Sequence, residues 1–167
     1  TDQYASVGVT FLGLEDGAPV DINAAPDPDG VTPPSGPNVL TNCADASLFC
    51  PGNRADVVRI LFDMPVFDIS LQLDSLGGDS VTFNLYDAAD ALLETLTITS
   101  GSSVFVPVAF TASDVRRIDG VQPNDGWAWA MDDLTFSRAE ASVPVPSTLL
   151  LFGLGLLGLG IRVRRTR

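Results

Sequence analysis

Residues 57–86 read VVRILFDMPVFDISLQLDSLGGDSVTFNLY, and this stretch sets the expectation for the fold. Within its FDISLQL run, large apolar side chains alternate with polar ones, as in an antiparallel strand that buries one face. The Met-Pro pair at 64–65 and the Gly-Gly-Asp run at 77–79 are turn formers that divide the stretch. The strands predicted here are 57–62, 67–73 and 80–86, with Phe67, Ile69, Leu71 and Leu73 facing one way.

The same pattern continues on both sides of this stretch. Alternating apolar residues predict one earlier strand over 5–12, and later strands over 92–99, 103–110 and 127–136. Strands that recur about every dozen residues, with almost no helical periodicity, predict an all-β fold built as an antiparallel two-sheet β-sandwich. We expect Pro107 at a sheet edge or bulge, because proline cannot donate to a sheet ladder.

Residues 21–53 interrupt the strand pattern with many prolines and glycines, and they are too long for a simple connection. We expect an Ω-type loop or a cover for one end of the domain. The loop contains both cysteines of the chain, Cys43 and Cys50. A metal site would need more ligands, and redox catalysis would prefer a CxxC spacing. We therefore predict a disulfide that stiffens the loop in an oxidising compartment.

Residues 147–163 form an uncharged stretch rich in Leu and Gly. As a helix it would span about 25 Å, the short end of a bilayer crossing. Pro144 and Pro146 separate it from the preceding chain, and an arginine cluster follows it. Because a buried core helix would still need a polar face toward water, we predict a single transmembrane helix, with the arginines on the cytoplasmic side.

The predicted anchor residues have apolar or small side chains in common: Leu149, Leu150, Leu151, Phe152, Gly153, Leu154, Gly155, Leu156, Leu157, Gly158, Leu159, Gly160 and Ile161. The residues that set its orientation are Arg162, Arg164, Arg165 and Arg167. The chain thus divides into a β-sandwich over 1–136, a linker over 137–146, the helix over 147–163 and a cytoplasmic tail over 164–167.

The charge of the chain is distributed unevenly. All 21 acidic residues but only five of the nine arginines precede the predicted anchor, so this part carries a formal charge of −16 and the tail +4. An acidic domain without a basic stripe argues against a nucleic-acid partner. The polar start at Thr1 predicts that an N-terminal signal peptide has been removed, as export requires.

The composition also argues against catalysis. The chain has no histidine, which excludes Ser-His-Asp and Cys-His arrangements and the usual zinc sites. It has no lysine, which excludes Schiff-base and Walker-type chemistry. Asp132 and Asp133 are neighbours on a predicted strand, so we expect them to face opposite ways and not to act as an acid/base pair. We predict that the protein is not an enzyme.

Trp127 and Trp129 would share one face of the last predicted strand. They could form an aromatic platform for a sugar ring, or they could pack in the core or at its edge. The alanines between and beside them leave the polar side of the strand undefined.

The end of the chain resembles the PEP-CTERM sorting tail of exported bacterial proteins. The resemblance is carried by the sorting motif Val143, Pro144, Val145, Pro146 and Ser147, then LLLFGLGLLGLG, then the arginines. It implies a Gram-negative type of envelope and recognition by an exosortase, a membrane enzyme that processes such tails near Pro-x-Pro. The family usually has Glu between the prolines where this chain has Val145, and this departure bears on whether the tail is processed.

The body resembles the β-sandwich ectodomains of PEP-CTERM proteins, which are similar to the jelly rolls of carbohydrate-binding modules. The residues that carry this resemblance are VTF at 9–11, SGPN at 35–38, VTFNLYDAAD at 81–90 and AMDDLTF at 130–136. It implies a structural calcium between Glu15 or Asp16 and Asp132 or Asp133, with loop carbonyls completing about six oxygens. The alternative is that these acids form a solvated face.

Three functions remain open. The first is a membrane-anchored envelope protein with a structural or binding role at the cell surface or in the extracellular matrix. The second is an accessory subunit of an energy-transducing complex in the inner membrane, with its β-sandwich on the periplasmic face. The third is a calcium-stabilised carbohydrate-binding module. The partners expected across these functions are membrane lipid, an exosortase, integral membrane subunits and extracellular polysaccharide.

Overall fold

The computed structural model describes residues 2–27, 30, 32–44, 47, 49–50, 54–76, 78–101, 104–122 and 127–138. The predicted sorting motif, transmembrane helix and arginine tail lie outside the described residues. Within those ranges, no helix combines the length and the hydropathy that a membrane crossing requires.

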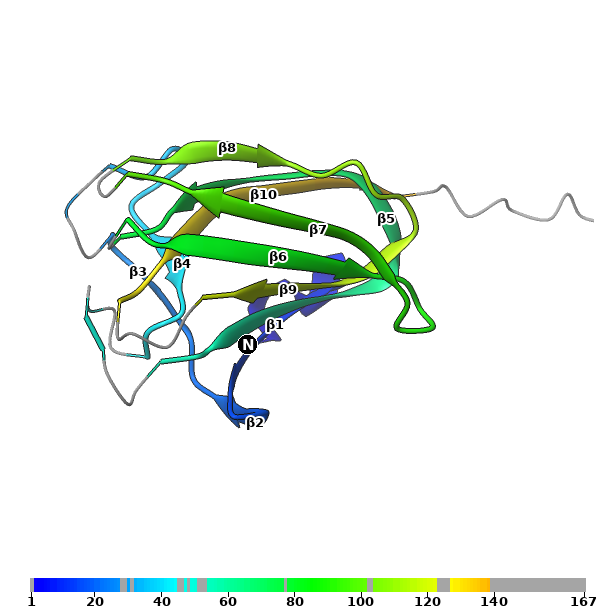
Figure 1. The fold of residues 1–167 in the computed structure, drawn as a ribbon, viewed down its shortest axis with the longest axis horizontal. Coiled ribbons are helices and arrows are strands. Elements are labelled where there is room, and N and C mark those ends of the chain that lie inside the picture. Colours follow the sequence, from blue (N-terminus) through cyan, green and yellow to red (C-terminus); the bar gives the residue numbers. More distant parts are fainter. Residues whose placement is uncertain are drawn as a thin grey trace, which may run out of the picture.

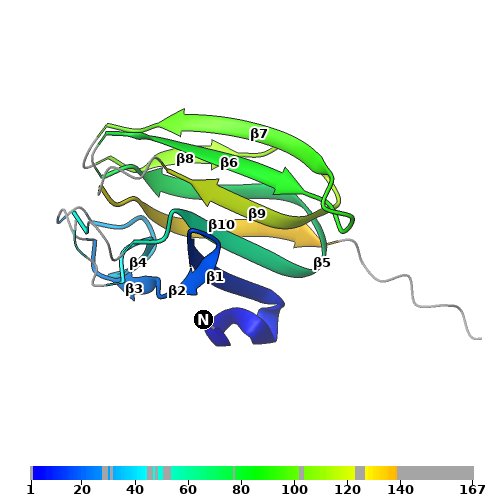
Figure 2. The same cartoon turned by 60° about the horizontal axis from the view of Figure 1, so that its bottom comes forward.

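Nearly all of the regular secondary structure among the described residues is strand, so the all-β prediction is confirmed. A short 3-10 helix, η1 (Asp2–Val7), precedes them. The strands are β1 (Val9–Glu15), β2 (Ala18–Val20), β3 (Asn23–Ala25), β4 (Val39–Thr41), β5 (Val57–Asp74), β6 (Ser80–Tyr86), β7 (Leu92–Thr99), β8 (Val106–Ala109), β9 (Val115–Val121) and β10 (Ala130–Arg138). They pair antiparallel and form two layers packed face to face, as Figures 1 and 2 show.

Strand β5 belongs to both layers. Its first part pairs with β1 and β9, and its second part pairs with β10 and β8. The order β2-β1-β5-β9-β6-β7 forms one layer, and β3-β4-β10-β5-β8 forms the other. The two predicted strands 57–62 and 67–73 are therefore one continuous strand. The Met-Pro pair bends the strand instead of reversing the chain, because Pro65 removes a ladder donor where the register with β9 shifts.

A bulge changes which residues of β5 face inward. Asp68 has φ = 50°, and the pairing of β5 with β10 shifts register close by. Val66 is consequently buried, and Phe67, which the alternation places on the buried face, is only half-buried. Beyond the bulge the predicted alternation holds, since Ile69, Leu71 and Leu73 are buried.

The core lies between the layers and centres on Trp129. Its indole meets the ring of Phe83 edge to face at 5.9 Å, and Phe83 meets Phe110 at 5.5 Å. Gly120 in β9 makes room for it, since a Cβ there would lie 3.0 Å from the indole. The packing of the core therefore depends on the Trp129 indole fitting into the space that Gly120 leaves free.

Several element boundaries differ from the prediction. Val7 belongs to η1 and not to a strand, because Gly8 (φ = 71°) turns the chain before β1 and its amide bonds to Ala5 O. Strand β8 is shorter than the predicted 103–110, and β10 begins three residues later than predicted. Pro107 does lie on an edge, since β8 pairs with β5 alone among the described strands.

The strand β10 gives the molecule two distinct ends. It begins at Ala130, beside the loop that contains Cys43 and Cys50, and it ends at Arg138 on the opposite side of the sandwich (Figure 1). Its nine residues span about 27 Å. We call the side with the cysteines the disulfide end, and the side with Arg138 the tail end.

Candidate functional site

The disulfide end is held together covalently and by strand-like bridges. Cys43 and Cys50 form a disulfide, as predicted, and both are buried. Cys43 also forms a β-bridge with Arg54, and Phe49 forms one with Trp127. The loop 21–53 is thus fastened to the rest of the domain at Cys43 and at Phe49.

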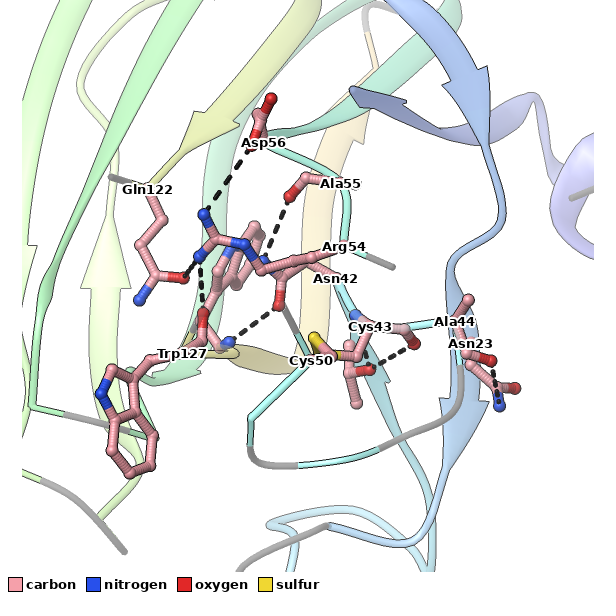
Figure 3. The surroundings of a disulfide bond; sticks show 12 residues. Asn23, Asn42, Cys43, Ala44, Cys50, Arg54, Ala55, Asp56, Gln122 and Trp127 are labelled. Carbon is pink, nitrogen blue, oxygen red and sulfur yellow. Dashed lines mark hydrogen bonds and ion pairs between the residues drawn. A yellow bond between two sulfur atoms is a disulfide. The ribbon is translucent and has the colours of Figure 1, made fainter. Parts of the chain in front are cut away.

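A buried guanidinium lies behind this loop. Arg54 is 2% exposed, and its Nη1 donates to Gln122 Oε1 at 3.1 Å and to the backbone oxygen of Trp127 at 2.6 Å. Its Nη2 lies 3.7 Å from Asp56 Oδ1 (Figure 3). A buried charge is tolerated only when it is paired and hydrogen-bonded. Arg54 therefore fixes the backbone from which the Trp127 side chain projects.

Asn42 supports the same region from inside. Its Nδ2 donates to Ala55 O at 3.2 Å, and its Oδ1 accepts from the amide of Trp129 at 2.9 Å. The side chain is fully buried, so both of these hydrogen bonds are shielded from water. Asn42 and Arg54 together hold the segment 127–129 at two points.

The structure places the two tryptophans in different surroundings. Trp129 is 1% exposed and belongs to the core, whereas Trp127 is 40% exposed. Figure 3 shows the indole of Trp127 pointing away from Arg54. Its ring meets Phe49, which is 51% exposed, at 5.4 Å between centroids and 65° between planes. We call Phe49 and Trp127 the aromatic pair. Sequence reasoning missed Phe49, because its partner is distant along the chain.

A second concave surface lies between η1 and β1 on one side and β4 and β10 on the other. This groove has a volume of about 410 Å³, within the range of small-molecule sites. It is lined by Tyr4, Val7, Val9, Phe11, Ala24, Ser35, Asn38, Val39, Leu40, Met131, Asp132, Asp133, Leu134 and Phe136. Its lining combines apolar side chains with polar groups, among them Ser35, Asn38, Asp132 and Asp133.

Asp132 and Asp133 both line this groove. The strand is irregular here, since Asp133 has φ = 51° and the register of β10 with β5 shifts after Asp132. The carboxylate of Asp132 accepts from the amide of Ser35 at 2.9 Å, from its hydroxyl at 3.0 Å and from the amide of Asp133 at 2.8 Å. Asp132 thus fastens the segment before β4 onto β10.

The other two acids of the predicted calcium site lie elsewhere. Glu15 ends β1, and the amide of Asp16 lies 3.4 Å from Asp56 Oδ2, next to the turn into β2. No three Asp, Glu, Cys or His residues within the described ranges are grouped as metal ligands would be. The calcium site implied by the resemblance, between Glu15 or Asp16 and Asp132 or Asp133 with loop carbonyls, stays a prediction.

The arginines of the sandwich bind protein acceptors. Arg59 forms a two-point ion pair with Asp119, with N–O distances of 2.7 and 2.9 Å. The hydrogen bonds that Arg59 donates to the carboxylate of Asp119 raise the pKa of Arg59, and burial opposes that shift. Arg117 lies 4.0 Å over the ring of Tyr86 and pairs with Asp90 and Asp119. Both guanidinium groups therefore form ion pairs within the domain.

The C-terminal segment has a match among known protein families. Residues 142–165 match the PEP-CTERM protein-sorting motif, so the resemblance predicted for the tail is confirmed. No curated protein is similar enough in sequence to count as a match.

The fold resembles solved β-sandwich carbohydrate-binding modules. TmCBM61 in complex with β-1,4-galactotriose shares 9% identity and a TM-score of 0.49, over 81% of this chain and 94% of that one. The C-terminal family 22 module of Clostridium thermocellum Xyn10B shares 13% sequence identity and a TM-score of 0.45, over 81% of this chain and 89% of the module. An arabinose-bound GH51 α-L-arabinofuranosidase shares 13% sequence identity and a TM-score of 0.47, over 75% of this chain but only 22% of the enzyme. These likenesses concern architecture alone.

Proposed function

We propose that this chain, in which a PEP-CTERM sorting motif follows a β-sandwich, is a non-catalytic binding protein that acts at the cell surface or in the extracellular matrix. The observation that carries the proposal is the motif at 142–165, which implies an exported, envelope-associated protein. The sandwich ends at Arg138, only a few residues before the motif. The sandwich is therefore the part that meets the surroundings of the cell.

The proposed ligand is extracellular polysaccharide. Two surfaces support a binding role: the groove, which is lined by both apolar and polar groups, and the exposed aromatic pair at the disulfide end. Sites for small molecules and sugars combine apolar area with a few fixed polar groups. A non-catalytic role agrees with the chemistry of the chain, which lacks both histidine and lysine.

The membrane topology is part of the proposal. The apolar stretch 147–163 would cross the inner membrane, with the arginines inside and the sandwich on the periplasmic side. An exosortase would then process the tail near Pro144 and Pro146 and release the sandwich toward the surface.

A second function is favoured by one residue. Val145 replaces the usual Glu of the sorting motif, and an unprocessed tail would keep the protein in the inner membrane. There it would serve as an accessory subunit of an energy-transducing complex, with its Gly-rich helix packed against partner helices.

Fractionation of native cells tests both functions. Under the first proposal, the sandwich appears trimmed in the surface or matrix fraction, and restoring the usual residue with Val145→Glu increases the trimmed form. Under the second, intact protein comigrates with a large complex after mild solubilisation, and Val145→Glu depletes it from that complex. Intact protein in the cytosol with reduced Cys43 and Cys50 would refute both.

A further inference from the structure

We infer that the aromatic pair, Phe49 and Trp127, is a binding site for an uncharged sugar ring, on the surface that the protein directs away from the membrane. The inference rests on the proposed function, since it names where the polysaccharide binds and which chemical class it belongs to. Four observations carry it: exposure, rigidity, charge and position.

The aromatic pair is unusual because its two exposed rings contact each other. Single exposed apolar residues are common on protein surfaces and need no explanation. Here two large rings from segments far apart in the sequence meet in the open, with 51% of Phe49 and 40% of Trp127 accessible. Their planes lie at 65°, so the two rings form a corner with aromatic surface on both sides. A corner of this kind can cover more than one side of a ring-shaped ligand.

The support beneath the pair is rigid. The Trp127 backbone accepts from the buried Arg54, and the residue after Phe49 is a disulfide-bonded cysteine. The bridge between Phe49 and Trp127 joins these two supports. The buried groups thus fix the positions of two rings that are themselves outside the core. Holding aromatic groups in place before binding reduces the entropy that binding must overcome.

The charge of the domain selects an uncharged ligand. The part of the chain before the sorting motif carries a formal charge of −16, so it repels acidic polymers. All five of its arginines bind protein acceptors instead of facing outward unpaired: Arg54 with Gln122, Arg59 with Asp119, Arg116 with Phe62 O, Arg117 with Asp90, and Arg138 with Asp63. A carboxylated or sulfated sugar would find no free guanidinium here. A neutral sugar ring can place its C–H face against an aromatic ring and lose little hydration.

The position of the pair suits contact with material outside the cell. The chain leaves the sandwich at Arg138, at the tail end, and continues to the sorting motif. The pair lies at the disulfide end, next to Cys50 and before the start of β10, and β10 itself spans about 27 Å between the two ends. Figure 2 shows the two ends of β10 on opposite sides of the sandwich. While the tail is held in the membrane, the disulfide end points outward.

Affinity electrophoresis of the full chain in detergent tests the inference. The gels contain neutral β-1,4-galactan, xylan or β-glucan, or the acidic polymers alginate and polygalacturonate. We expect the neutral polymers to retard the wild type and the acidic ones not to. Phe49→Ala and Trp127→Ala should each weaken binding by on the order of tenfold, because an aromatic ring in the centre of a site contributes this much. Leu93→Ala, which truncates an exposed side chain on β7, should change nothing.

The two tryptophans provide a second measurement. Because Trp129 is buried and Trp127 is exposed, a bound sugar should change the fluorescence of Trp127 alone. Trp127→Phe should keep most of the binding, since a ring remains, but lose the fluorescence change. The Tm of each variant should equal that of the wild type, because the substitutions change side chains that are exposed.

Three results would overturn the inference. Unchanged binding by Phe49→Ala and Trp127→Ala, with loss of binding in Tyr4→Ala, would place the ligand in the groove and leave the proposed function intact. Preference for the acidic polymers would refute the charge argument. Failure of the wild type to bind any polymer would refute both the site and the polysaccharide role, and fractionation would still report on the envelope location.

Discussion

Removing the disulfide should destabilise the sandwich by an amount set by its small loop. Cys43 and Cys50 are separated by 7 positions, and the chain-entropy relation gives about 2.5 kcal/mol for a loop of this length. Both residues are buried, so the replacements must be apolar, and the double variant Cys43→Ala/Cys50→Ala removes the disulfide without placing a polar group in the interior. For a chain of 167 residues this loss corresponds to a fall in Tm of about 5–10 °C.

The assay is thermal and urea unfolding of the full chain in detergent, with and without reductant. The Tm of the reduced wild type should equal that of the double variant, and reductant should not change the Tm of the double variant. The neutral-polymer binding of the double variant should also fall, because the segment that carries Phe49 loses its covalent support. A Tm that stays within 1 °C of the wild type, with the wild-type disulfide verified by mass spectrometry, would contradict the reasoning.

The remaining predictions concern the core, the disulfide end and calcium. Gly120→Ala should lower the free energy of unfolding by about 1–3 kcal/mol, because its Cβ would lie 3.0 Å from the Trp129 indole; urea unfolding measures it, and a stability equal to wild type would show that the ring can shift. Asn42→Ala should cost about 2–4 kcal/mol in the same assay, because it leaves Ala55 O and the Trp129 amide without their partner; a cost below 0.5 kcal/mol would show that water replaces it. Calcium or EDTA should leave Tm unchanged, since the carboxylate of Asp132 already accepts hydrogen bonds from Ser35 and from the amide of Asp133. A calcium-dependent rise in Tm would show binding in another geometry.

The sequence predicted those strands in which apolar residues recur at alternate positions. The strands 80–86 and 92–99 were predicted with the bounds that the structure gives to β6 and β7. Strand β9 was missed because its sequence VRRIDGV carries Arg116, Arg117 and Asp119, which hide the alternation. Those charges are satisfied by partners on neighbouring strands and on loops, and a single run of sequence contains no information about such partners.

The candidate sites depended on contacts between distant residues. Composition and spacing were enough to predict the disulfide, because its two cysteines are the only pair in the chain. The environments of Trp127 and Trp129 could not be separated, because their difference comes from Asn42 and Arg54, far away in the sequence. The bulge at Asp133 was also not predicted, because strict alternation does not indicate where a strand becomes irregular.

The continuity of β5 matters for a domain that is tethered by its C-terminus. Tension on the tether enters the domain through Arg138 and β10, whose main neighbour is the second part of β5. Since the first part of β5 is hydrogen-bonded between β1 and β9, the load passes into both layers through one backbone and is shared by many bonds in shear. Such a domain resists peeling one strand at a time and should yield in a single mechanical step, which single-molecule stretching from the C-terminus would record as one rupture peak.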